Sequence, residues 1–466
     1  MDVTLSLTGE QAARLHAHLF PDDGCEAVAI ALCGHRSAAG LHRLLVQEIQ
    51  LIPYDQCNER RPDLVRWPTH LLLPLLDKAN RRSLSLVKIH GHRVDYPQFS
   101  ATDDESDREL FASVPGWIDA AVPHASVIAL SDGRFLGRTF APDGSVSPLE
   151  RITIVGDDLR FYFADGFSSA GMPMNLPEFT RRHAQAFGQN TVNILRRLTV
   201  AVIGCSGTGS PVIEQLARLG VGRLILVDPD IVEEKNLNRI LHATMADVAA
   251  RRFKVEVLAD AIRAIGLGTE VISLPNSLFD RRVVQAVAGA DVVFGCMDSA
   301  EGRRVLNRLA TYYVLPYIDL GVKLQASTDG TIDQVSGAVH YLQPGRSSLL
   351  SRKVIDSETV RAEGLRRRNP AEYAALKRER YIVGVDEERP AVISVNLLVA
   401  AMAVNELLAR IHDFRTDGNA GFAEWRVSLS HGIFHNCGEG ASCPTLARSI
   451  GLGDIEPMLG DPELSA

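Results

Sequence analysis

Hydrophobic positions along this chain recur with the periods of strands and helices, and the two kinds of element alternate. In the first third, helical spacing predicts helices at residues 11–20, 69–80 and 107–121. Apolar runs typical of strands occupy residues 26–32, 44–53, 84–90 and 125–130, and residues 135–155 predict a hairpin. Strands and helices that alternate in this way predict an α/β fold.

The alternation becomes more regular in the second half. Helices are predicted at residues 178–197, 211–219, 245–264, 281–288 and 299–312. Strands are predicted at residues 200–203, 223–227, 270–273, 291–295 and 316–319. This order predicts a doubly wound, largely parallel Rossmann-like sheet. Residues 351–380 are polar and basic, which favours a solvated surface helix over a binding patch, and residues 392–411 predict a long apolar helix of the core or of a subunit interface.

Residues 157–176 contain Gly, Ser, Pro and Met with little periodicity, so we place the domain boundary there. We predict a first domain at residues 1–156, a linker at 157–177, a second domain at 178–453 and a flexible tail at 454–466. The length of 466 residues is enough for about two or three domains with ample core.

Composition limits the partners and the cellular compartment that we expect for this protein. The net charge of −8 argues against nucleic acid as the main partner. The seven cysteines are scattered without the spacing of a disulfide framework, which favours a reducing compartment. The first twenty residues lack the apolar core of a signal peptide, and we find no run of membrane-spanning length. We therefore expect a cytoplasmic protein without a membrane partner.

The first domain contains a pattern of metal-binding side chains. His90 and His92 end a predicted strand at two-residue spacing, so their side chains share one face of the sheet. Ser100 follows after seven residues, and Asp103 after two more. Two imidazoles and a carboxylate suit Zn²⁺ with water in an open fourth position, and Glu26, which begins an apolar strand, is placed to accept the proton of that water. A single His-x-His is more often structural, but the full series favours a metal site.

These residues resemble the JAMM (JAB, or MPN-plus) metalloprotease motif, a glutamate followed by His-x-His-x7-Ser-x2-Asp, over about residues 1–155. The resemblance implies that the two histidines and Asp103 bind zinc, that Glu26 is the general acid/base and that Ser100 stabilises the oxyanion. Gly91 stands where the family has Ser or Thr, but that residue is not a ligand. Because members cleave isopeptide or peptide bonds after ubiquitin-like proteins, the resemblance implies a deubiquitinase-like JAB-type peptidase domain.

A glycine-rich turn begins the second domain. The strand that starts at Val200 ends in Gly204, and Gly207 and Gly209 follow just before a helix. Glycines let the backbone approach an anion, which then lies at the helix N-terminus. Many α/β proteins carry such a turn without using it, so the turn alone leaves the ligand open. Asp228 ends the next strand, about twenty residues further on, where a carboxylate can bind a ribose hydroxyl.

Polar residues after that strand favour a triphosphate over a nicotinamide. Asn236 lies near Arg239 and Lys254, two cations that suit phosphates. Asp298 follows a strand at the carboxyl edge of the predicted sheet, where it could hold Mg²⁺. Each of these residues taken singly also fits a surface or capping role. An NAD enzyme is an alternative that this set of residues argues against.

Together these residues resemble the ThiF/MoeB/HesA family, the adenylating module of ubiquitin-activating enzymes, over about residues 178–450. The glycine turn corresponds to Gly-x-Gly-Gly-x-Gly, with Ser206 in place of one glycine. The resemblance implies that Asp228 binds ribose, that Asn236, Arg239 and Lys254 act at the phosphates, and that Asp298 is linked to magnesium. Arg182, six residues before Gly188, corresponds to an arginine that reaches the ATP of a partner subunit, which implies a homodimer.

Two features of the family are missing. Its paired Cys-x-x-Cys zinc knuckles are absent, and residues 322–395 contain no cysteine, so a thioester nucleophile of the usual placement is not there. Cys437 and Cys443 lie near the C-terminus, close to His431 and His435. They are candidates for a thioester site, for a partial zinc site with the two histidines, or for structural residues.

The combined motifs predict one enzyme with two activities. The second domain would adenylate the C-terminal carboxylate of a ubiquitin-like protein with ATP and Mg²⁺, and the acyl group would pass to a cysteine here or on a ubiquitin-conjugating-like enzyme. The first domain, with Zn²⁺, would process the precursor or remove conjugates. Such fusions resemble bacterial ubiquitin-like modification operons, some of which act in antiviral defence. The alternatives are activation and processing of a sulfur carrier, and a nucleotide-sensing protein without catalysis.

Overall fold

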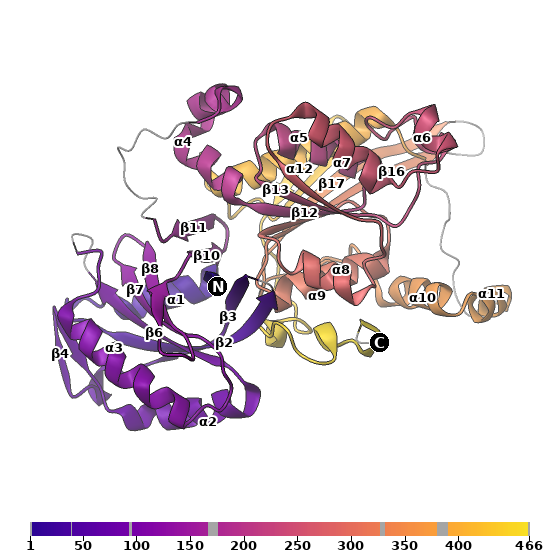
Figure 1. Cartoon of the computed structure of the whole chain (residues 1–466). Helices are drawn as coiled ribbons and strands as arrows, with labels where there is room; N and C mark the ends of the chain where they lie inside the picture. Colours follow the sequence, from indigo (N-terminus) through magenta and orange to yellow (C-terminus); the bar gives the residue numbers. More distant parts are fainter. Residues whose placement is uncertain are drawn as a thin grey trace. The chain divides into compact units, whose positions relative to one another are not determined.

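The computed structural model describes residues 2–38, 40–92, 96–165, 176–326, 331–379 and 390–464. The chain forms two compact units (Figure 1). The N-terminal unit consists of residues 1–172 with 312–314 and 449–455, and the C-terminal unit consists of the remaining residues. Each unit is described by itself.

The N-terminal unit is built on a mixed sheet of nine strands in the order β11-β10-β1-β3-β2-β6-β7-β8-β9. Its strands are β1 (Asp2–Thr8), β2 (Val28–Ala38), β3 (Leu41–Leu51), β6 (Ser85–His92), β7 (His124–Leu130), β8 (Phe135–Phe140), β9 (Val146–Pro148), β10 (Arg151–Val155) and β11 (Leu159–Phe163). Its helices are α1 (Gly9–Leu19), α2 (Leu73–Arg82) and α3 (Ala101–Ser113), and a separate ribbon pairs β4 (Glu59–Arg61) with β5 (Leu64–Arg66).

Both faces of this sheet are buried. Alternate residues of β2 belong to different apolar clusters, Ala29 and Ala31 to one and Ile30 and Leu32 to the other. The first cluster includes apolar residues of α1, and the second includes residues of α2 and α3. The sheet therefore lies between helical layers, and β6 in its centre is buried along its whole length.

The C-terminal unit is built on an eight-stranded sheet in the order β14-β13-β12-β15-β16-β17-β18-β19. The strands are β12 (Thr199–Ile203), β13 (Arg223–Val227), β14 (Glu270–Leu274), β15 (Val292–Gly295), β16 (Tyr317–Ala326), β17 (Ile332–Leu342), β18 (Glu424–Ser428) and β19 (Ile433–Cys437). The five strands from β14 to β16 are parallel, which confirms the predicted Rossmann-like sheet, and β16 to β19 form an antiparallel extension.

Helices cover both faces of this sheet (Figure 1). The helices of this unit are α4 (Arg181–Arg197), α5 (Gly209–Arg218), α6 (Met245–Ala249), α7 (Lys254–Ile265), α8 (Arg281–Val287), α9 (Ala300–Tyr312), α10 (Ser357–Arg368), α11 (Pro370–Arg378) and α12 (Ile393–Ile411). Helices α5, α7 and α12 lie on one face of the sheet, and α8 and α9 lie on the other. The helix predicted at residues 245–264 is two helices, because a β-bridge between Ile231 and Phe253 interrupts it.

Helix α12 corrects one expectation. Among the described residues it is long and apolar enough to cross a membrane by length and composition, whereas we expected no such run. It packs against α5, β16 and β17, and 61% of its most apolar window is buried. Its last turns also bury an ion pair, Glu406 with Arg410 at 2.6 Å. Such burial is typical of a core helix.

Two predicted irregular segments contain ordered structure. The predicted linker at residues 157–177 includes β11, which pairs with β10, although residues 166–175 lie outside the described residues. The predicted flexible tail forms two 3₁₀ turns, Met458–Gly460 and Pro462–Leu464, and buries Met458, Leu459 and Leu464. The prediction of a flexible tail was therefore wrong for residues 454–464. Its few apolar residues have no helical or strand period, so the sequence pattern could not reveal their packing.

Histidine burial in the N-terminal unit gives a pH prediction. His42 is 5% exposed, and its Nε2 lies 2.9 Å from His35 Nδ1. Burial lowers the pKa of His42 to about 4, so the unfolded chain takes up a proton at higher pH than the folded protein does. Protonation of His42 in the unfolded chain should therefore lower the free energy of unfolding as the pH falls from about 6.5 toward 4. Urea midpoints at pH 7.5 and 5 should differ less in His42→Gln than in the wild type.

The matched control is His70→Gln, at an exposed histidine of the same unit. It should keep the wild-type difference between the two midpoints. An unchanged difference in His42→Gln would contradict the role assigned to this side chain.

Candidate nucleotide and metal sites

The glycine turn after β12 brings three backbone segments into close contact. Gly204 has a φ of 92°, and a Cβ atom there would lie 2.5 Å from the carbonyl oxygen of Cys296. A Cβ atom on Gly209 would lie 1.8 Å from the Gly204 carbonyl oxygen. Both positions therefore require glycine. Ser206 does not adopt a positive φ, so a serine fits where the resemblance expects glycine.

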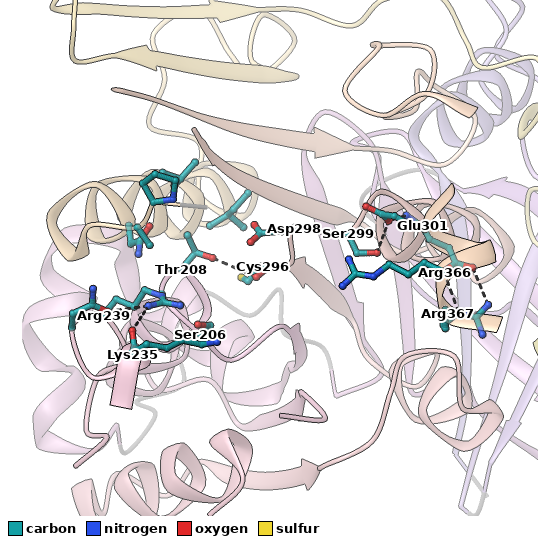
Figure 2. A pocket seen from close by; sticks show the side chains of 18 of the residues that line it. Ser206, Thr208, Lys235, Arg239, Cys296, Asp298, Ser299, Glu301, Arg366 and Arg367 are labelled. Carbon is teal, nitrogen blue, oxygen red and sulfur yellow. Dashed lines mark hydrogen bonds and ion pairs between the residues drawn. The ribbon is translucent and has the colours of Figure 1, made fainter. Parts of the chain in front are cut away.

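A cavity of about 780 Å³ opens at this turn. Figure 2 shows its two ends, with Cys296, Asp298 and Ser299 between them. The glycine-turn end is lined by Ser206, Gly207, Thr208, Lys235, Asn238 and Arg239. The opposite end is lined by Phe279, Glu301 and the α10 residues Glu363, Arg366 and Arg367. The cavity thus lies at the carboxyl edge of β12 and β15, where open α/β sheets bind ligands.

Of the predicted nucleotide residues, Gly207, Arg239 and Asp298 line this cavity. The Arg239 guanidinium is oriented by hydrogen bonds from Nη1 to the Lys235 carbonyl oxygen, 2.7 Å, and to Asn238 Oδ1, 3.0 Å. Lys235 and Asn238 also line the cavity, although the sequence had not singled them out as site residues. Their position in the polar run after β13 is the sequence feature that could have indicated them as site residues.

Asp228 and Lys254 are not among the residues that line the cavity. Asp228 instead binds the backbone of the glycine turn, and Lys254 lies beside Asp228. The two carboxylate oxygens of Asp228 accept hydrogen bonds from the backbone N–H groups of Cys205, 2.7 Å, and Asp230, 2.9 Å. Lys254 Nζ lies 2.7 Å from Asp230 Oδ2 and 3.7 Å from Asp228 Oδ1. Burial raises the pKa of Asp228, and the nearby Lys254 opposes this effect. Their assignments to ribose and phosphate stay predictions.

Asn236 and Arg182 also lie away from the cavity lining. Asn236 is buried, and its Oδ1 accepts a hydrogen bond from the Glu233 N–H at 3.1 Å, so it shapes the turn that presents Arg239. Arg182 is exposed in the first part of α4, before a kink at Gly188, where φ is 76°. Its predicted role toward the ATP of a partner subunit stays a prediction.

Residues 351–380 were expected to form a solvated surface helix, but the described part contains two helices, and one side of α10 lines the cavity instead of facing open solvent. Glu363 Oε2 accepts hydrogen bonds from Ser299 Oγ, 3.0 Å, and from the Glu301 N–H, 2.8 Å. Arg367 Nη2 and Nε donate to the two carboxylate oxygens of Glu301, at 2.9 and 3.1 Å. The helix is therefore a wall of the cavity. Its charged composition is typical of a surface helix, so the sequence pattern could not reveal these contacts.

The C-terminal cysteines differ in exposure. Cys443 is 2% exposed, and its N–H donates to the carbonyl oxygen of Arg346. Cys437 ends β19 and is half-buried, with its Sγ 3.5 Å from His435 Nε2. His431 Nδ1 instead lies 2.9 Å from Ser428 Oγ. These cysteines and histidines do not form a three-ligand cluster within the described ranges, which disfavours the partial zinc site.

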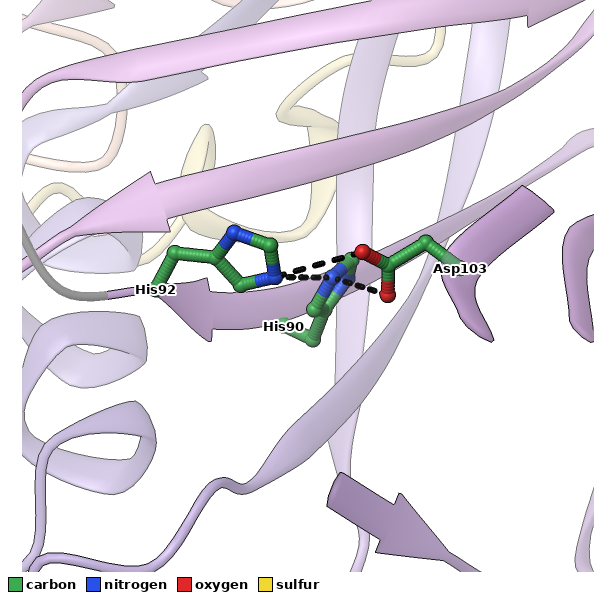
Figure 3. Close-up of side chains that lie close together, drawn as sticks. All are labelled: His90, His92 and Asp103. Carbon is green, nitrogen blue, oxygen red and sulfur yellow. Dashed lines mark hydrogen bonds and ion pairs between the residues drawn. The ribbon is translucent and has the colours of Figure 1, made fainter. Parts of the chain in front are cut away.

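The predicted metal residues of the N-terminal unit do converge. His90, His92 and Asp103 are the group of three potential ligands found among the described residues, with ligand atoms within 4.8 Å of one another. Figure 3 shows the two imidazoles of β6 directed at the carboxylate. His90 Nε2 lies 2.9 Å from Asp103 Oδ1 and 3.1 Å from His92 Nε2, and His92 Nε2 lies 3.4 Å from Asp103 Oδ2. Two imidazole nitrogens and one carboxylate are a donor set that fits Zn²⁺.

Protonation equilibria in this cluster follow from burial and pairing. Burial lowers the pKa of His90. For His92, burial alone would lower the pKa, but the hydrogen bond to Asp103 and the charges of Asp103 and Glu26 together raise it. Burial opposes ionisation of Asp103, but hydrogen bonds with the two histidines hold the pKa of its carboxyl well below the usual range. The cluster therefore favours an ionised carboxylate, the form that binds a cation.

Glu26 and Ser100 adjoin the cluster in different ways. Glu26 Oε1 lies 4.0 Å from His92 Nε2, and burial raises the pKa of Glu26 to about 7. Ser100 is the N-cap of α3, and its Oγ donates to Asp103 Oδ2 at 2.7 Å. The structure thus places all five predicted residues together, with Ser100 orienting Asp103.

A buried ion pair that the sequence did not single out holds α3 against β6. Asp107, one helical turn after Asp103, is fully buried and accepts hydrogen bonds from Lys88 Nζ and Arg138 Nη2, both at 2.7 Å. Lys88 lies two residues before His90 on β6, on the same face of the strand. This pair fixes the strand and helix that carry the candidate metal-binding side chains.

Comparison with known proteins gives the family. The model of the ThiF family matches residues 180–441. Mouse adenylyltransferase and sulfurtransferase MOCS3 is 38% identical over 114 residues, 24% of each chain. Ubiquitin-like modifier-activating enzyme 5 of Caenorhabditis elegans is 29% identical over 193 residues, 38% of this chain and 44% of that protein. The chain thus spans less than half the length of these curated relatives.

A solved structure of the microcin C7 biosynthetic enzyme MccB with N-formylated MccA has a TM-score of 0.45 and 20% identity, over 59% of this chain and 75% of that one. Because the family match extends over more than half of the 466 residues, the chain belongs to the ThiF family.

Proposed function

We propose that this chain uses ATP to adenylate the C-terminal carboxylate of a ubiquitin-like protein. The observation that carries the proposal is the single cavity that joins the glycine turn, Arg239, Lys235 and Asp298. Membership in the ThiF family supports it, as do relatives named as adenylyltransferases and as ubiquitin-like modifier-activating enzymes.

The residues of the cavity fit the reaction. The backbone of the turn and the N-terminus of α5 suit phosphate oxygens, and Arg239 and Lys235 offset the charge that develops when a carboxylate attacks the α-phosphate and pyrophosphate leaves. Asp298 is exposed in the cavity, and a single carboxylate together with substrate phosphates suffices to hold Mg²⁺. The ion would supply further charge neutralisation.

A further part of the proposal concerns where the acyl group goes after adenylation. We place its transfer on a cysteine, either of this chain or of a ubiquitin-conjugating-like enzyme. In this chain the partly exposed Cys437 fits such a role better than the buried Cys443. A homodimer that shares Arg182 between sites belongs to the same proposal. If the substrate is instead a sulfur carrier, mass spectrometry will detect a thiocarboxylate rather than a conjugate.

Exchange of pyrophosphate into ATP tests the adenylation. With ubiquitin-like proteins ending in Gly-Gly from the same genome, the wild type should catalyse exchange. Arg239→Ala should lower the rate about 10²-fold, because it removes one group that stabilises developing charge. Asp298→Asn should lower the rate more at low than at high Mg²⁺ concentration, because it removes a proposed ligand of the ion.

The control for this test is Arg263→Ala, at an exposed arginine of α7 that pairs with Asp260. It should exchange pyrophosphate like the wild type. Tight ATP binding without exchange for any of these proteins would refute the adenylation and favour a nucleotide-sensing protein.

We further propose that the N-terminal unit is a zinc peptidase that processes the ubiquitin-like protein or removes its conjugates. The convergence of His90, His92 and Asp103 beside Glu26 supports this proposal. The bound ion would activate a water molecule. Glu26, whose pKa of about 7 suits proton exchange near neutral pH, would take the proton and return it to the leaving amine.

Metal content and cleavage test the two parts of this proposal separately. We expect about one zinc per chain by plasma mass spectrometry in the wild type and in Glu26→Gln, and none in Asp103→Ala. Cleavage of a ubiquitin-like protein fused to a fluorogenic amine should fall at least ~10²-fold in Glu26→Gln, because the proton acceptor is lost.

The matched control is Glu105→Gln, at an exposed carboxylate of α3, the helix that also carries Asp103. This variant should keep both zinc and cleavage. Retained cleavage in Glu26→Gln would refute the assigned base, and zinc retained in Asp103→Ala would refute the assigned ligand.

A further inference from the structure

The C-terminal residues 456–464, which we call the strap, lie across three helices of the C-terminal unit. Three strap carboxylates contact five arginines of α8, α9 and α10. The pairs are Glu456 with Arg281, Asp461 with Arg304 and Arg308, and Glu463 with Arg367 and Arg368. Three apolar strap side chains, Met458, Leu459 and Leu464, are buried. The strap is thus anchored by apolar burial and by charge.

Helix α10 has little apolar packing of its own. Its buried residues are Ala362 and Gly364, which together contribute a small apolar area. Its position therefore depends on hydrogen bonds and ion pairs at its ends. At its C-terminal end these include the contacts of Arg367 and Arg368 with Glu463, where Arg367 Nη2 lies 3.0 Å from Glu463 Oε2, beside the hydrogen bonds of Arg367 to Glu301.

The same helix fixes the segment that carries Asp298. Glu363 accepts hydrogen bonds from Ser299 Oγ and the Glu301 N–H, and Arg367, one turn later on α10, binds the Glu301 carboxylate through two N–H groups. Ser299 follows Asp298 directly, and both line the cavity. An unbroken series of contacts therefore runs from Glu463 through α10 to the residues beside Asp298.

We propose that the strap positions the cation-binding side of the cavity, with Glu463 as a positioning residue that holds α10 and, through Glu363, the segment of Asp298. The part of the proposal that concerns Mg²⁺ and ATP rests on the proposed function. The strap sets the affinity for magnesium-bound ATP, while the glycine-turn end, which binds the phosphates through the backbone and Arg239, does not depend on it.

Hydrogen exchange of the nucleotide-free full chain tests the positioning directly. In Glu463→Gln, amides of α10 and of residues 299–302 should exchange faster than in the wild type, while those of α5 should not change. Glu456→Gln is the matched control, because it removes an ion pair of the same strap that contacts α8 rather than α10. It should leave α10 unchanged. Unchanged α10 exchange in Glu463→Gln would overturn the proposal.

Calorimetric titration with ATP, with Mg²⁺ or with EDTA, tests the consequence. Glu463→Gln should weaken binding of ATP with Mg²⁺ about two- to fivefold, the range expected when a partly exposed carboxylate loses its ion pairs, and leave binding in EDTA unchanged. Equal weakening in both conditions would overturn the link to the cation, because a general loss of structure acts on both. If the wild type binds no ATP, the proposed function and this link both fail, while faster α10 exchange still supports the positioning role of the strap.

Discussion

In the C-terminal unit, the most demanding constraint is the contact of three backbone segments at the glycine turn. Gly209 approaches the Gly204 carbonyl, and Gly204 in turn approaches the Cys296 carbonyl, more closely than any Cβ atom allows. This contact joins the end of β12, the start of α5 and the end of β15. Because Ser206, Gly207 and Thr208 thereby line the cavity directly before the N-terminus of α5, the turn determines where an anion can bind.

Buried carboxylates complete the geometry that the turn begins. Asp228 accepts two backbone N–H groups, one from the turn and one from the segment after β13. A carboxylate is costly to bury unless it is hydrogen-bonded, so the two segments are held where both bonds form. In the N-terminal unit, Asp107 has the corresponding role, because its pairs with Lys88 and Arg138 join α3 to the sheet that carries the histidines. In both units, a buried carboxylate that does not face the candidate site holds together the segments that carry the site residues.

The two candidate sites differ in how closely the sequence predicted them. Four of the five candidate metal-site residues lie together because His90 and His92 come from one strand and Ser100 and Asp103 begin one helix, whereas the pairing of β2 with β6 brings the distant Glu26 beside them. The nucleotide residues divide into two groups. Arg239 and Asp298 face the cavity, whereas Asp228, Asn236 and Lys254 form hydrogen bonds and an ion pair behind it. Spacing along the chain identifies which residues end a strand or follow a turn, but it does not give the direction of each side chain.

The sequence by itself determined the α/β alternation, the parallel sheet, the glycine turn and the spacing of His90, His92 and Asp103, because these features depend on local periodicity and on neighbouring residues. The tertiary structure decided the role of α10 and of the C-terminal strap. Arg367 and Glu463 are 96 residues apart, and ion pairs between distant segments leave no periodic trace in a sequence. A charged helix and an acidic tail therefore have the pattern of solvated segments, and only their contacts in the folded chain show that they form and brace one wall of the cavity.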